Sequence, residues 1–146
     1  MNRIGALIVG VAGSWMVLGG HLLFSTAAYA NVCRWQVDGK WTLYQRNGFR
    51  LPMNLRQSGD FANGSTYGDA VLGSGNVRSL MDGKHFTMTI NWQNGQQGYY
   101  EGNVEVQWNG SQQTFVLKGW MYDLSQPWNR VDWWKGTLMY YRCTPT

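Results

Sequence analysis

Hydrophobic and polar residues alternate with a period of two along much of the chain from residue 40 onward. The segment 86–92 places Phe, Met, Ile and Trp at every second position, with Thr, Thr and Asn between them. The segments 51–56 and 103–108 repeat the pattern. A period of two is typical of a β-strand with one face in a core and one in water. Because no segment after residue 30 combines a helical period with capping residues, the chain is predicted to be all-β.

Turn signals separate these alternating runs at short intervals. Asn-Gly and Asp-Gly pairs stand at 47–48, 82–83, 94–95 and 109–110, and glycine-rich turns stand at 58–60 and 73–76. Asn-Gly and Asp-Gly favour two-residue hairpin turns, because both positions can take a positive φ. The predicted strands are 40–46, 49–57, 61–67, 70–80, 85–93, 98–108, 113–122 and 131–142.

Eight strands in meander order predict an antiparallel up-and-down β-barrel. Such a barrel has no free edges, since its last strand pairs with its first. An open β-sandwich is the alternative. Large side chains are needed to fill a small barrel, so most aromatic residues are expected in its interior.

The first thirty residues have the features of a secretory signal peptide. Arg3 gives a positive start, 4–24 is almost wholly apolar, and Ala28-Tyr29-Ala30 forms an A-x-A cleavage site. We therefore expect a signal peptide over 1–30, a single β-barrel domain over 31–146, and a secreted or periplasmic protein. The competing interpretation is an uncleaved membrane anchor, which the glycines of the apolar stretch weaken.

Two cysteines, Cys33 and Cys143, stand near the two ends of the expected mature chain. In an oxidising compartment we expect them to form a disulfide, and two free thiols are the alternative. Because a disulfide requires Cα atoms within roughly 7 Å of each other, the first and last strands are predicted to be neighbours. The terminal disulfide should then lie where the barrel closes.

Charge and motifs argue against nucleic-acid binding and most catalytic chemistry. Losing Arg3 with the signal lowers the formal charge only from +4 to +3, too mild for a nucleic-acid footprint. His85 is then the one remaining histidine, so neither a metal site nor a Ser-His-Asp triad is expected. A glycosidase pair among Glu101, Glu105, Asp123 and Asp132 is the remaining enzymatic option. We expect no enzyme, no metal and no cofactor.

Tryptophan is the most unusual feature of the composition. Of the nine tryptophans only Trp15 lies within the first thirty residues. The pairs Tyr99-Tyr100 and Trp133-Trp134 put aromatic rings on both faces of their strands, because neighbours in a strand point to opposite sides. Aromatic rings with amide neighbours suit sugar rings and flat heterocycles. The pattern favours a non-enzymatic protein that binds a small molecule or a glycan.

Several short motifs resemble the avidin and streptavidin family of biotin-binding barrels. Gly39-Lys40-Trp41 resembles the family's opening G-x-W, and the Gly64–Tyr67 segment its third-strand glycine-tyrosine motif. Thr89–Asn94 resembles the tryptophan strand that ends in W-x-N, Tyr100-Glu101-Gly102 the following aromatic-x-G, and Trp134–Leu138 the late W-K-x-T-L. The motifs follow the family's order over most of the mature chain, and the resemblance implies an eight-stranded barrel.

The polar half of the family's biotin site differs in this chain. Leu43 and Asn47 replace the asparagine and serine that bond the biotin ureido group, Gln97 and Gly98 replace a serine and a threonine, and the terminal-strand aspartate is missing. A buried urea without its partners binds weakly, so high-affinity biotin binding is not expected. The resemblance implies an aromatic cage of Trp92 and Trp134 with Tyr67 as polar partner. The predicted binding residues are stacking walls and two orienting amides: Trp92, Trp134, Tyr67, Tyr100, Asn91 and Gln93.

A second resemblance supplies the alternative function. Bacterial inhibitors of secreted metalloproteases are exported barrels whose G-x-W-x-L start resembles Gly39–Leu43. Their disulfide is internal, and they act through a free N-terminal segment, which Cys33 would tether here. A protease inhibitor or another protein-binding barrel is therefore the second interpretation. No nucleic-acid partner and no membrane association after signal cleavage are expected, and homo-oligomer formation stays open.

Overall fold

A computed structural model describes residues 31–145 of the chain. The expected signal peptide, 1–30, lies outside the described residues. Within residues 31–145 no helix is long and apolar enough to cross a membrane. The chain forms ten strands there: β1 (Asn31–Gln36), β2 (Gly39–Gln45), β3 (Arg50–Ser58), β4 (Phe61–Tyr67), β5 (Ser74–Asp82), β6 (His85–Trp92), β7 (Gln97–Asn109), β8 (Gln112–Asp123), β9 (Val131–Lys135) and β10 (Tyr140–Pro145).

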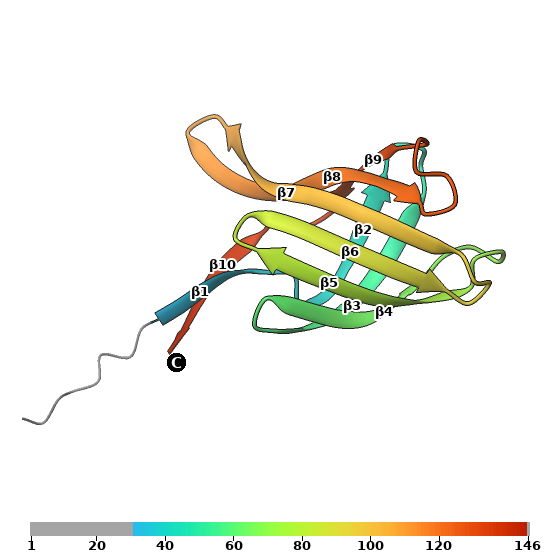
Figure 1. Cartoon of the computed structure of the whole chain (residues 1–146). Coiled ribbons are helices and arrows are strands. Elements are labelled where there is room, and N and C mark those ends of the chain that lie inside the picture. The colour runs from blue at the N-terminus through green and yellow to red at the C-terminus, as the bar shows by residue number, and fades with distance from the viewer. Residues whose placement is uncertain (1–30, 146) are drawn as a thin grey trace, which may run out of the picture.

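Strands β2 to β9 form a closed antiparallel barrel in sequence order, which confirms the predicted fold class. Figure 1 shows the meander, with the long β7–β8 hairpin projecting beyond the rest of the barrel. The barrel closes where β2 pairs with β9, with Tyr44 opposite Trp134 and Gln45 opposite Trp133. This pairing determines which side chains of β9 face inward.

The first and last strands lie outside the barrel, in a two-stranded ribbon of β1 and β10. Cys33 pairs with Cys143 in this ribbon, and their sulfur atoms form the expected disulfide. The terminal strands are neighbours, as predicted, but the expectation that the disulfide lies at the barrel's closure is wrong. The predicted strand 131–142 is in fact two strands, since β9 ends at Lys135 and β10 begins at Tyr140.

Hydrogen bonds from Gln57 and Trp41 connect the end of the ribbon strand β1 to the barrel. The Gln57 amide of β3 donates to the Trp35 carbonyl oxygen (3.0 Å) and accepts from the Val37 backbone N–H (2.9 Å). The Trp41 indole N–H donates to the Val37 carbonyl oxygen (2.9 Å). Because Trp35 and Val37 are themselves buried, the start of the barrel wall and the end of β1 share one core.

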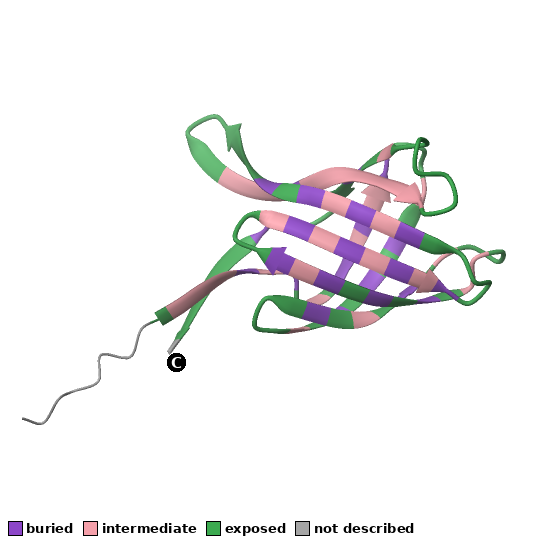
Figure 2. Cartoon of the chain, viewed as in Figure 1, coloured by how far each residue is buried: buried purple, intermediate pink, exposed green. Residues whose placement is uncertain are grey.

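Side chains fill the barrel interior. Every second residue of β6 is buried, and Figure 2 shows the same alternation along β5 and β7. Leu43, Leu51, Phe86, Ile90 and Leu117 have no exposed surface. Small barrels of eight strands are just wide enough for side chains to fill them. The cavities described below lie outside this core, at the outer face and at the ribbon.

The Asp and Asn of two predicted turn pairs lie at strand ends, and the glycine that follows each of them begins the turn. Asp82 pairs with His85 and Asn109 pairs with Gln112, so Asp82 and Asn109 end their strands and do not occupy the turn. Gly83 takes the first turn position with a φ of 58°, and no non-glycine residue within 31–145 has a positive φ. The Asp and Asn of these pairs therefore do not use the positive φ that they can adopt, although the hairpins form where the pairs predict them.

Candidate functional site

Two of the predicted binding residues, Trp92 and Tyr100, point into the barrel. Both are buried, and a Cβ on Gly98 at the start of β7 would lie 3.0 Å from the Tyr100 ring and 3.7 Å from the Trp92 indole nitrogen. The Gln45 side-chain amide donates to the Tyr100 hydroxyl (3.3 Å). Burial raises the pKa of Tyr100 above its ordinary value, and the bond from Gln45 offsets a small part of that rise. These residues belong to the packed interior.

The other four predicted residues lie on the outside of the barrel. Trp134 is 44% exposed and Tyr67 is 56% exposed. Asn91 accepts from the Gln97 amide (2.7 Å), and Gln93 accepts from the Ser74 hydroxyl (3.2 Å). The structure therefore does not bring the six predicted residues together in one pocket.

The pair Trp133-Trp134 shows why the predicted cage is divided. Trp133 is the buried member, 1% exposed, and its indole N–H donates to the Trp120 carbonyl oxygen (2.9 Å). Gly102 and Gly119 face each other across β7 and β8, and a Cβ on Gly102 would lie 2.9 Å from the Trp133 ring. Gly102 leaves the space that Trp133 fills, and Gly119 allows the close approach of the β7 backbone. Trp134, one residue on, must point outward.

An outer groove of about 800 Å³ runs over the outside of β7, β8 and β9. Its aromatic rings come from the half-buried Trp120 of β8 and the exposed Trp134 of β9, and Trp120 pairs with Asp132 in register. Polar and charged side chains complete the lining: Arg46, Glu105, Gln107, Lys118 and Asp132. A volume of this size is within the range of ligand-binding clefts.

Aromatic stacking holds the rings around the outer groove in place. Trp134 stacks on Tyr44 of β2 with ring centroids 5.8 Å apart and an interplanar angle of 14°. Trp120 stacks on Tyr122 at 5.6 Å and 14°, and Tyr99 of β7 packs against both. We call this set, Tyr44, Tyr99, Trp120, Tyr122 and Trp134, the outer aromatic face.

Charged groups surround the outer aromatic face and are paired with one another. Lys118 Nζ lies 2.7 Å from Glu105 Oε2, and Arg46 Nη1 lies 3.3 Å from Asp132 Oδ2. The Arg130 guanidinium lies over the Trp120 ring, 4.1 Å from its centroid, a cation–π arrangement. The pairs are exposed, so each contributes little to stability, but together they border the rings with hydrogen-bonding groups.

The surroundings of the outer aromatic face also raise the pKa of one of its phenols, that of Tyr99. The pKa of Tyr99 is raised, first by partial burial and then by the negative charge of Glu101 and the neighbouring Tyr122. Tyr99 therefore stays a neutral hydrogen-bond donor at physiological pH.

Each of the four carboxylates among which a glycosidase pair was considered has a partner in the structure. Besides the pairs of Glu105 and Asp132, Asp123 accepts from the Ser125 hydroxyl (2.6 Å), and Glu101 Oε1 lies 3.7 Å from His85 Nε2. Within residues 31–145 no group of three or more metal-ligating side chains could hold an ion. The arrangement offers stacking rings, hydrogen bonds and charge.

Sequence reasoning missed Tyr44, Trp120 and Tyr122 as surface residues. Trp120 and Tyr122 are two positions apart on one predicted strand, so they share a face. Leu117 and Gly119, at the alternate positions, are the inward residues of that strand. Reading this alternation through β8 would have identified the outer pair.

The fold and the site define a closed β-barrel with a filled interior and an aromatic groove on its outer face. Compared with protein-family models, with curated proteins and with solved structures, the chain matches none. The eight-stranded antiparallel architecture is compatible with the avidin-like fold that the motifs imply. The disulfide is consistent with an oxidising compartment.

Proposed function

We propose that the protein is an exported, non-enzymatic binding protein that takes a glycan in the outer groove. One observation carries the proposal: Trp120 and Trp134 line the same groove, each with its ring held by a stacked tyrosine. A ring held in place loses little freedom when a ligand stacks on it, so more of the stacking free energy contributes to affinity. Trp134 is 44% exposed.

Glycan chemistry suits this lining. The C–H face of a pyranose is apolar and flat enough to stack on an indole, while its hydroxyls need donors and acceptors around the edge. Glu105 and Asp132 supply acceptors, Lys118 and Arg46 supply donors, and Gln107 supplies both. A chain of two or three sugar units fits a groove of about 800 Å³ better than a single compact heterocycle does.

A distant relation to avidin is part of this proposal as architecture, and biotin as ligand is not. Trp92 and Tyr100 are packed in the interior, and Leu43, with no exposed surface, stands where the family has a ureido-bonding asparagine. The proposed ligand site is therefore on the outer face, and the interior residues Trp92 and Tyr100 are not part of it.

Isothermal titration calorimetry of the purified, oxidised protein against a panel of neutral and acidic oligosaccharides tests the proposal. Trp134→Ala should weaken binding of any glycan by at least about tenfold. Trp128→Ala is the matched control, because Trp128 is 78% exposed but does not line the groove, and its affinity should equal the wild-type value. Equal loss in both variants, or no binding by any glycan, would refute the groove as a glycan site.

A protein partner is the second candidate, and the β7–β8 hairpin favours it. The hairpin projects beyond the barrel (Figure 1) and exposes Trp108 (67%) and Val106 (40%) near its end. In this second candidate function the protein holds a secreted protease at the hairpin, inhibits it, and binds no glycan. Trp108→Ala should then abolish inhibition in an assay of secreted metalloproteases, while Trp134→Ala leaves it unchanged.

A further inference from the structure

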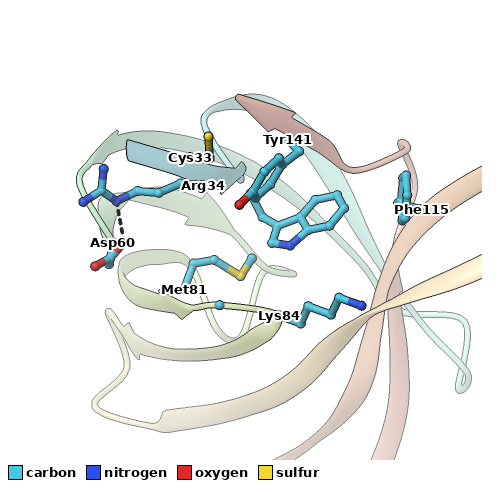
Figure 3. A pocket seen from close by; sticks show the side chains of 9 residues that line it. Cys33, Arg34, Asp60, Met81, Lys84, Phe115 and Tyr141 are labelled. Carbon is cyan, nitrogen blue, oxygen red and sulfur yellow. Dashed lines mark hydrogen bonds and ion pairs between the residues drawn. The ribbon is translucent and has the colours of Figure 1, made fainter. Parts of the chain in front are cut away.

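A second cavity lies where the disulfide ribbon meets the barrel. Its volume is about 510 Å³ (Figure 3). The ribbon supplies Trp35 and Tyr141, the β5–β6 hairpin supplies Met81 and Lys84, and β8 supplies Phe115. Because these elements are far apart in the sequence, the cavity exists only when the ribbon packs against the barrel. None of its lining residues belongs to the outer groove.

One wall of this ribbon cavity is aromatic and apolar. The Trp35 ring lies 4.9 Å from the Phe115 ring and 5.1 Å from the Tyr141 ring, tilted by 58° and 54°. Trp35 and Met81 are buried, whereas Tyr141 is 58% exposed at the mouth. In Figure 3 Met81 and Tyr141 lie on opposite sides of the opening. A flat apolar ring entering between them would bury most of its surface.

The lining of the cavity carries a net positive charge. Its charged side chains are Arg34, Lys84 and Asp60. Asp60 Oδ1 lies 2.5 Å from Arg34 Nε, so that ion pair neutralises one positive charge. Lys84 takes part in none of the ion pairs formed within residues 31–145. In Figure 3 the Lys84 side chain extends from the β5–β6 hairpin towards the side of the cavity on which Phe115 lies, away from Arg34 and Asp60.

We infer that the ribbon cavity binds a small amphiphilic anion, a flat aromatic ring system that carries a carboxylate. The ring packs against Trp35, Phe115 and Tyr141, and the carboxylate accepts a charge-assisted hydrogen bond from Lys84, while Arg34 stays paired with Asp60. An uncharged sugar lacks both features, so the cavity and the outer groove select different ligands. The inference does not depend on the proposed glycan function.

Indole-3-acetate is a suitable probe, and indole-3-acetamide is its uncharged isostere. Calorimetry on the oxidised protein should give saturable one-site binding of the acetate, and the amide should bind at least about fivefold more weakly. Absence of saturable acetate binding, or equal affinity for the amide, overturns the inference.

Two pairs of variants locate the site. Lys84→Gln should weaken acetate binding by at least about fivefold, while Lys40→Gln, an exposed lysine away from the cavity, leaves it unchanged. Tyr141→Ser removes part of the aromatic wall and should weaken acetate binding. Tyr140→Ser changes the exposed neighbour, which does not line the cavity, and should leave acetate binding unchanged. Binding that survives both Lys84→Gln and Tyr141→Ser contradicts this location. Trp134→Ala should not affect acetate binding. Failure of the glycan proposal and failure of the ribbon-cavity proposal are therefore distinguishable.

Discussion

Lys135 makes the stability of the protein depend on pH in a direction opposite to that of most lysines. Its side chain points inward from β9 and is 7% exposed. The ammonium donates to the Thr137 hydroxyl and to the Leu138 carbonyl oxygen, and it lies 5.4 Å from the centroid of the Trp41 ring. No ion pair within residues 31–145 includes it. Burial without a counter-ion lowers the pKa of Lys135 to about 8 from its ordinary 10.5.

The sign of the effect follows from which state holds the proton. Between pH 8 and 10.5 the unfolded chain keeps the Lys135 proton and the folded chain releases it. The unfolded state binds more protons in this window, so the free energy of unfolding rises with pH. Below pH 8 both states are protonated, and the penalty for burying the charge is constant. Above about pH 10 the trend reverses, because burial raises the pKa of Tyr100 and the unfolded chain loses that proton first.

The rise in the free energy of unfolding can be measured over a short pH range. Integrating the proton difference from about pH 7.5 to about pH 9.5 gives a gain of at most about 2 kcal/mol. Urea unfolding followed by far-ultraviolet circular dichroism measures it, with Lys135→Met as the control that keeps the length and removes the charge. A flat or falling wild-type profile, or the same slope in Lys135→Met, contradicts the assignment.

Three further predictions concern stability, each measured by urea unfolding. Replacing Cys33 and Cys143 with alanine should lower the free energy of unfolding by about 4 kcal/mol while β-sheet circular dichroism persists, since β2–β9 pairing closes the barrel without them. Gly102→Ala should cost about 2 kcal/mol, because its Cβ would lie 2.5 Å from a β8 carbonyl oxygen. Trp133→Ala should cost about 3 to 5 kcal/mol, and exposed Trp134→Ala under about 1 kcal/mol; similar losses in the two tryptophan variants would contradict their inside and outside placement.

The barrel could be predicted because its strands carry local signals. Residues 86–92 alternate strictly, and the apolar set is the buried set. Glycine turns at 82–83 and 109–110 set the hairpin boundaries to within a residue or two. Period-two patterning fixes which residues share a face, so fold class and strand order follow from the sequence.

The ribbon could not be predicted as a separate unit. β1 and β10 are six residues each, with little alternation between apolar and polar positions. The cysteines correctly indicated that the termini meet. Gly136 is a weak local sign in the run 131–142 of the break between Lys135 and Tyr140, where the chain leaves the barrel and packs Met139 into the core. The break depends on long-range packing, which a local pattern does not record.

Periodicity alone could not locate the candidate site, because it does not say which face of a strand is inside the barrel. Adjacent tryptophans at 133 and 134 must face opposite ways, but only the register of β9 decides which one is inside. That register is coupled to Gly102, which makes room for the indole and is itself distant from it in sequence. Once Trp133 fills the interior, Trp134 becomes a surface ring beside Tyr44. The packing that closes the barrel core to a ligand is thus the same packing that builds the aromatic groove outside it.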